Sequence, residues 1–224
     1  MTSSAVPITP ELHEYLLAHS TQPDPISGEL IERTNALGEV ARMQIAPEQG
    51  LLLTMLVQSL GARAAVEIGT FTGYSSLAIA RGLAPGGTLV CCDISEEWTA
   101  HARWAWKEAG VEDRIDLRIA PALDTLRTLP QTEHLDFAFV DADKAGYPAY
   151  YAELITRLRP GGLIAIDNVF QLGEVVASRR EKAAAAGHTD TAAIHAFNEQ
   201  LAADPRVDVV MLPIADGLTL ARKR

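Results

Sequence analysis

Residues 64–75 read Ala-Ala-Val-Glu-Ile-Gly-Thr-Phe-Thr-Gly-Tyr-Ser. The first five suit a buried strand, the next five form a turn with two glycines, and a helical pattern follows from Tyr74. No strand pattern precedes residue 64, whereas short apolar runs alternate with helical ones after it. A strand, a glycine-containing turn and a helix are the repeating unit of an α/β fold. The sheet of this protein therefore begins at this stretch.

The runs that follow have the lengths and spacing of strands in one sheet. The expected strands are 64–68, 88–92, 115–119, 135–140, 162–166, 207–212 and 218–222, and the expected helices between the first five are 74–81, 96–109, 122–129 and 147–158. This alternation predicts a Rossmann-like, doubly wound α/β fold with a mostly parallel, seven-stranded sheet. Residues 215–217 form a turn of hairpin length, so at least one C-terminal strand should be antiparallel.

The 224 residues are enough for one domain with a single sizeable core. We divide it into an N-terminal helical segment, 1–60, and a Rossmann-like core, 61–224. Helices are expected in the N-terminal segment at 10–18, 26–39 and 47–60, two of which open with a proline. The alanine run 183–186 lies in a charged segment that we interpret as a solvated helix or flap.

The composition excludes several classes of protein. With 19 basic and 29 acidic residues the net charge is −10, which opposes a nucleic-acid partner. No apolar run approaches the ~18 residues of a membrane span, and Met1-Thr2-Ser3-Ser4 lacks the basic start of a secretion signal, so we expect a cytoplasmic protein with no membrane partner. Cys91 and Cys92 are neighbours in an apolar run and should be reduced. No two histidines lie four residues apart, so a bound metal would need oxygen ligands.

The turn after the first strand suits a cofactor, because ligands of open parallel sheets bind beyond the carboxyl ends of the strands. Gly69 and Gly73 allow a tight turn and the close approach of a ligand, and Ser75 could cap the following helix. A dinucleotide motif would place glycine at the positions of Phe71 and Tyr74. Binding of a pyrophosphate here is therefore weakly supported.

Asp93 follows the second expected strand, where an acidic side chain can accept hydrogen bonds from the hydroxyls of a ribose. A purely structural alternative remains open, in which the glycines serve the turn and Asp93 caps the helix that begins at Glu96. We interpret Trp98, Trp104 and Trp106 as packing residues rather than ligand contacts.

Polar side chains follow two later strands. Asp141, Asp143 and Lys144 come after the strand that ends at Val140, and Asp167 and Asn168 come after the next one. If these strands are neighbours, Asp141, Asp167 and Asn168 converge as two carboxylates and one amide oxygen, a set that suits a hard cation such as Mg²⁺. The alternative is an exposed pair of Asp143 with Lys144 and an ordinary turn at 167–168.

The sequence from Met43 onward, about 80% of the chain, resembles the metal-dependent O-methyltransferases of the caffeoyl-CoA and catechol type in their short bacterial form. The matching stretches are 43–50, 67–75, 92–94, 121–123, 140–144, 161–168 and 212–224. The resemblance implies that S-adenosylmethionine contacts Met43, Ile45, Glu67, Gly69, Thr70, Phe71, Gly73, Ser75, Asp93, Ile94, Ala122, Asp141 and Asp143. Within this set it places Asp93 on the ribose and Ala122 beside the adenine.

The resemblance also implies a divalent cation on Asp141, Asp167 and Asn168, with Mg²⁺ favoured and Mn²⁺ or Ca²⁺ as alternatives. The implied acceptor is a vicinal aromatic diol: a catechol, a phenylpropanoid or a polyketide-derived phenol. Both of its oxygens would reach the ion, which positions one of them against the methyl group and lowers its pKa. The implied catalytic residues are Lys144, as general base, and Asp141. A homodimer is a further expectation from the family.

Two positions depart from the family pattern close to the expected acceptor. Gln171 stands where the family usually has a tryptophan, and Ala145-Gly146-Tyr147 replaces a stretch that often has an asparagine before the tyrosine. Phe170, Gln171 and Tyr147 are our candidate substrate contacts, and the changes indicate an altered acceptor rather than a lost reaction.

Two other functions compete with this interpretation. A nicotinamide-dependent oxidoreductase would share the sheet and Asp93, but it needs phosphate-binding glycines that are missing here and has no use for the oxygen triad. A degenerate methyltransferase that only binds the cofactor or a partner would be consistent with Gln171. The presence of Asp141, Lys144, Asp167 and Asn168 argues against it.

Overall fold

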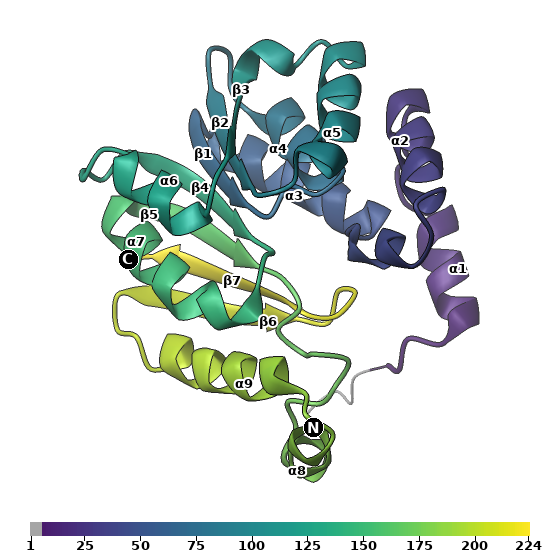
Figure 1. Ribbon diagram of the computed structural model, residues 1–224, viewed down its shortest axis with the longest axis vertical. Helices are drawn as coiled ribbons and strands as arrows, with labels where there is room; N and C mark the ends of the chain where they lie inside the picture. Colours follow the sequence, from purple (N-terminus) through teal and green to yellow (C-terminus); the bar gives the residue numbers. More distant parts are fainter. Residues whose placement is uncertain (1–5) are drawn as a thin grey trace.

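A seven-stranded sheet forms the centre of the computed structural model, which describes residues 6–224 (Figure 1). The strands are β1 (Ala64–Ile68), β2 (Thr88–Asp93), β3 (Ile115–Ile119), β4 (Leu135–Val140), β5 (Leu158–Ile166), β6 (Val207–Leu212) and β7 (Leu218–Lys223), in the order β3-β2-β1-β4-β5-β7-β6. The first five pair in parallel, and β7 is antiparallel to both β5 and β6. This arrangement confirms the predicted fold. The residues Met1-Thr2-Ser3-Ser4 used above lie outside the described part.

Helices cover both faces of the sheet, because successive strand residues alternate between two apolar layers. Ala65 of β1 packs into the layer beneath α3 (Pro47–Leu60), α4 (Tyr74–Gly82) and α5 (Glu96–Glu108), whereas Val66 packs into the layer beneath α6 (Ala122–Thr128), α7 (Tyr147–Arg157) and α9 (Thr189–Ala202). Helix α2 (Pro25–Asn35) adds its buried Leu30 to the first layer, whereas α1 (Pro10–Ala18) and α8 (Ala177–Ala185) lie outside both layers (Figure 1). Within residues 6–224, no helix combines the length and the apolar character needed to cross a membrane. That the whole chain forms one domain stays a prediction.

Several predicted boundaries are wrong. The second N-terminal helix ends at Asn35 instead of residue 39, because Gly38 adopts a left-handed φ of 79° and a separate 3-10 helix, Gly38–Met43, follows it. Strand β5 begins at Leu158 rather than residue 162, with a register irregularity against β4. Helix α9 was not predicted, although its buried Ile194, Phe197 and Leu201 have helical spacing.

The cap predicted at Ser75 is also absent. Gly73 is the N-cap of α4, no side chain caps the helix, and Ser75 lies inside its first turn. The left-handed backbone of Gly73, with φ of 91°, sets the direction of the helix instead.

The backbones that follow β1 and β4 approach each other closely at Gly69 and Asp141. Gly69 has φ of 90°, and a β-carbon on it would lie 2.0 Å from the carbonyl oxygen of Asp141. The amide of Asp141 donates to the carbonyl of Ile68 at 2.8 Å, and this hydrogen bond holds the two backbone segments together. Only glycine therefore fits where the turn after β1 passes the end of β4.

We expect Gly69→Ala to lower the free energy of unfolding by more than about 3 kcal/mol, because it combines a disfavoured backbone conformation with a clash against the main chain. Gly86→Ala is the matched control: Gly86 also has a positive φ, 75°, but a β-carbon there would meet nothing within 4 Å. Its cost should be about 1 kcal/mol. Urea unfolding of both variants measures the difference, and equal losses would show that the close approach does not constrain residue 69.

Candidate active site

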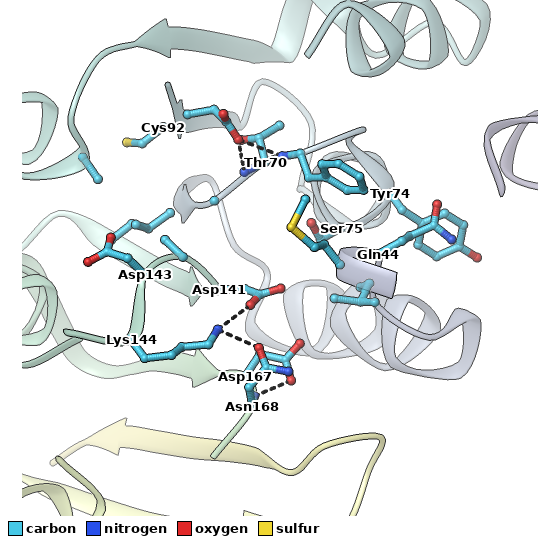
Figure 2. A pocket seen from close by; sticks show the side chains of 18 of the residues that line it. Gln44, Thr70, Tyr74, Ser75, Cys92, Asp141, Asp143, Lys144, Asp167 and Asn168 are labelled. Carbon is cyan, nitrogen blue, oxygen red and sulfur yellow. Dashed lines mark hydrogen bonds and ion pairs between the residues drawn. The ribbon is translucent and has the colours of Figure 1, made fainter. Parts of the chain in front are cut away.

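A cavity of about 1000 Å³ opens at the carboxyl ends of the central strands. It is lined by the turn after β1, by residues that follow β2, β3, β4 and β5, and by the segment that leads into α3. Figure 2 shows the side chains of Asp141, Asp143, Lys144, Asp167 and Asn168 in this pocket together with those of Thr70 and Ser75. This is the edge at which ligands of open parallel sheets bind.

Most of the residues expected to contact the cofactor lie on the wall of this cavity. Those present are Met43, Ile45, Gly69, Thr70, Phe71, Gly73, Ser75, Asp93, Ile94, Ala122, Asp141 and Asp143. Glu67 is the exception, because its side chain is fully buried beneath the turn. Residues of both sequence halves, far apart in the chain, therefore meet at one site.

Asp93 holds the turn after β1 in place. One of its carboxylate oxygens, Oδ2, accepts hydrogen bonds from the amides of Thr70 (2.9 Å) and Phe71 (2.8 Å). These bonds stabilise a left-handed conformation at Phe71, with φ of 50°. The cap of α5 is Ser95, whose hydroxyl accepts from the amide of Trp98 at 3.2 Å, so the alternative role of Asp93 as that cap is wrong. Asp93 organises the turn and also faces the cavity.

Two of the three expected metal ligands, Asp141 and Asn168, contact the side chain of Lys144, and the third, Asp167, accepts a hydrogen bond from the amide of Asn168. The ammonium group of Lys144 donates to Asp141 Oδ1 at 3.0 Å and to Asn168 Oδ1 at 2.6 Å (Figure 2). It also donates to the hydroxyl of Tyr147 at 2.7 Å. Among the residues that the structure describes, no three His, Cys, Asp or Glu side chains gather as a metal site, so the set depends on the amide of Asn168. The donors converge on one positive group, which is the environment a cation requires.

Asp167 is the most buried member of this set. Burial and the nearby charge of Asp141 raise the pKa of its carboxyl group. Its Oδ1 accepts from the amide of Asn168 at 2.7 Å, and its Oδ2 accepts from the side-chain amide of Gln49 at 2.7 Å. Two donors thus support the ionised carboxylate against the cost of its burial.

The predicted acceptor contacts are only partly brought together. Gln171 lines the cavity, and its side-chain amide donates to the carbonyl of Asn168 at 3.2 Å. Phe170 does not line the cavity and packs on Gly217, where a β-carbon would come within 2.6 Å of the ring. Tyr147 is fully buried; its hydroxyl accepts from Lys144 and donates to the carbonyl of Asp167 at 3.2 Å. Tyr147 therefore supports the site from behind the wall.

Sequence reasoning missed two acidic residues on the cavity wall. Asp216 and Asp190 line the cavity, and Asp216 Oδ1 accepts from the amide of Leu172 at 2.6 Å, which ties the loop after β5 to the turn before β7. Burial raises the pKa of Asp216. The turn signal at 215–217 was recognised, but nothing local in the sequence indicates that it faces the site.

Two of the three tryptophans pack within the fold as predicted, whereas Trp98 lies on the cavity wall. Trp106 is buried and donates to the hydroxyl of Ser76 at 3.1 Å, as a packing residue would. Trp104 packs beneath the guanidinium of Arg33 at 3.7 Å. Trp98, in contrast, lines the cavity and meets the ring of Phe71 edge-on, with 5.2 Å between ring centroids.

Glu67 carries a carboxyl group into the core beside the site. Neither of its oxygens accepts a hydrogen bond of ordinary geometry. Burial raises the pKa of Glu67 to about 7, although the side chains of Ser75, Thr70 and Cys91 partly oppose this increase. The folded protein without ligands thus retains a proton that the unfolded chain releases near its usual pKa of 4.5.

The contribution of Glu67 to stability is therefore fully present below pH 4.5 and is lost as the pH rises to about 7. We expect the stability of Glu67→Gln, relative to the original protein, to increase across this window, because glutamine has no charge to bury. Urea unfolding at pH 4 and pH 8 measures the effect, and Glu108→Gln, at the exposed end of α5, serves as the control. A difference that is independent of pH would contradict the assignment.

Comparisons with known proteins agree with this geometry. Residues 17–224 match the family model described as O-methyltransferase. The chain is 42% identical over 212 residues to a probable caffeoyl-CoA O-methyltransferase 1 of Dictyostelium discoideum, which covers 93% of this chain and 90% of that relative. It is 37% identical over 218 residues to caffeoyl-CoA O-methyltransferase 2 of Zea mays, covering 95% of this chain and 83% of that relative.

Solved structures show the same arrangement. An O-methyltransferase from Bacillus cereus in complex with SAH has a TM-score of 0.82 at 33% identity, over 96% of this chain and 97% of that one. TomG from Streptomyces achromogenes, in complex with SAM, has a TM-score of 0.81 at 29% identity, over 95% and 96% of the two chains. The chain therefore belongs to the O-methyltransferase family and is a SAM-dependent O-methyltransferase of the caffeoyl-CoA type.

Proposed function

We propose that this enzyme transfers a methyl group from S-adenosylmethionine to one hydroxyl of a vicinal aromatic diol, with the help of a divalent cation held by Asp141, Asp167 and Asn168. The observation that carries the proposal is the meeting of two sets of residues in one cavity: the turn at Gly69, which suits the cofactor, and three oxygen donors, of which Asp141 and Asn168 contact Lys144. Each set alone could serve only the stability of the fold. Stability does not explain why both sets meet at one ligand-binding edge of the sheet.

The cofactor half fits S-adenosylmethionine in its chemistry. Gly69, Gly73 and Asp93 all line the cavity, and we assign the carboxylate of Asp93 to the ribose hydroxyls. The hydroxyl oxygen of Thr70 and the side-chain carbonyl of Gln44 are buried on the cavity wall without hydrogen-bond partners. Unpartnered buried polar atoms are costly unless a ligand supplies the partner. We assign these groups to cofactor binding.

The oxygen donors fit a hard divalent cation, and Mg²⁺ is our first choice among Mg²⁺, Mn²⁺ and Ca²⁺. When bound, the cation supplies Lewis acidity toward the two acceptor hydroxyls, and S-adenosylmethionine supplies the methyl group. Asp141 and Asp167 balance the charge of the ion, and Asn168 completes the set without adding a further negative charge. The site thereby stays near neutral when the acceptor loses its proton.

Lys144 is the general base in this proposal. A phenol with a pKa near ~10 is almost entirely protonated at neutral pH, so transfer requires a group that removes its proton. Lys144 Nζ lies beside two of the three metal ligands, and the buried hydroxyl of Tyr147 orients it. Gln171 and Asp216 also line the cavity, and we assign them to contacts with the acceptor ring or its substituents. The cytoplasmic location and the homodimer stay predictions.

A panel of aromatic diols incubated with enzyme and S-adenosylmethionine, with Mg²⁺ or with a chelator, tests the reaction directly. We expect mass spectrometry to show a gain of one methyl group only in the Mg²⁺ arm. Methylation in both arms would keep the cofactor assignment and discard the role of the metal. If no diol reacts but S-adenosylmethionine binds in a titration, the chain is a cofactor-binding protein without this activity.

Lys144→Ala should lower the rate of methyl transfer about 10²- to 10⁴-fold, because it removes the base. Lys107→Ala changes the net charge equally at an exposed position of α5 and should leave the rate unchanged. The dependence of the rate on pH decides the role. If the profile of Lys144→Ala keeps the shape of the original profile, the proton leaves by another route.

A further inference from the structure

Gln49 is a buried polar residue at the candidate metal site that the proposed mechanism does not use. It lies in the first turn of α3, is fully buried and lines the cavity. Its side-chain amide donates to Asp167 Oδ2 at 2.7 Å, across 118 positions of sequence. The N-terminal helical segment thus contacts the oxygen set directly.

The position of Gln49 is fixed independently of any ligand. A β-carbon on the adjacent Gly50 would lie 2.7 Å from the ring of Tyr74, so α3 and α4 pack as closely as a glycine allows. One turn further along, the hydroxyl of Thr54 donates to the carbonyl of Ala78 at 2.9 Å. The start of α3 therefore presents Gln49 to Asp167 from a rigid support.

The hydrogen bond from Gln49 completes the fixation of the Asp167 carboxylate. The amide of Asn168 donates to Oδ1 at 2.7 Å, so one donor holds each oxygen. A carboxylate held by one donor can rotate about its side-chain torsion, whereas two donors on different oxygens define its plane. Partners of this kind orient metal ligands, and their loss typically weakens metal binding about 10- to 100-fold.

We propose that Gln49 is a positioning residue for the divalent cation, acting through the orientation of Asp167. This inference rests on the proposed function, because it requires that Asp167 bind a metal. The other polar atom of the side chain, Oε1, is buried without a hydrogen-bond partner. Contacts within the protein therefore do not fully offset the free-energy cost of burying this amide. The amide nitrogen of Gln49 carries this role, since it is the atom of this side chain that donates to Asp167.

The test uses Mn²⁺ as the probe ion, with binding to the full, metal-free chain measured by titration calorimetry. Gln49→Met removes both polar atoms at similar size, and Gln49→Leu removes them with a shorter apolar side chain. We expect both variants to bind Mn²⁺ about 10- to 100-fold more weakly. Gln58→Met, an exposed position on the same helix, should bind it as the original protein does.

Two further measurements separate this role from a general structural one. Thermal melting of the metal-free variants should match the original protein within a few degrees, and the affinity for S-adenosylmethionine without metal should stay within about threefold. If Gln49→Met does not fold, Gln49→Leu decides the question. Unchanged Mn²⁺ affinity in a folded Gln49 variant overturns the inference alone, whereas an original protein that binds no Mn²⁺ overturns both the inference and the proposed metal site.

Discussion

The close passage of two backbones, at Gly69 and Asp141, is the constraint on which the site depends. The turn after β1 would carry the cofactor, and the segment after β4 would carry the first oxygen donor. Because the two touch without an intervening side chain, cofactor and cation would share one wall. A transfer reaction requires its donor and acceptor atoms to be close and aligned. Here the proximity is set by the main chain, and the side chains only refine it.

The close packing at this edge of the sheet also brings negative charges together, and neighbouring donors compensate them. Asp141 and Asp167 lie near each other at the buried end of the sheet, where two unscreened carboxylates would repel strongly. The ammonium of Lys144 contacts Asp141, while Asp167 receives hydrogen bonds from Asn168 and Gln49. On the protein surface, water and salt would screen the repulsion between such carboxylates. Burial makes the surrounding donors necessary, and the proposed cation would reduce the remaining repulsion.

The sequence predicts the features of this protein that depend on neighbours in the chain. The alternation after residue 63 predicts the sheet, and the residues at strand ends predict the oxygen set, because parallel strands end at one edge. Element boundaries that depart from the periodicity were not predicted. Gly38 ends a helix that the periodicity would continue, and β5 begins before its apolar run.

Features that depend on packing could not be read in this way. Gln49 lies in a helix that looks entirely structural, and only the fold brings it to Asp167. Phe170 and Tyr147 are close in sequence to the site residues, yet one packs on Gly217 and the other lies behind Lys144. Proximity in sequence fixes which strand end a residue follows, but the direction of its side chain is decided by its neighbours in space.

The position of β7 between β5 and β6 also determines the order in which the molecule can be assembled. During synthesis β6 emerges before β7 and has no strand to pair with until β7 follows it. Phe170 likewise lacks its contact with Gly217, and Leu172 its bond to Asp216, until that hairpin has been made. A nascent chain can thus form the turn after β1 and its neighbours from β1, β2 and β4 before the loop after β5 gains these contacts. The cavity wall at which we propose acceptor binding is complete only when the last strand has entered the sheet.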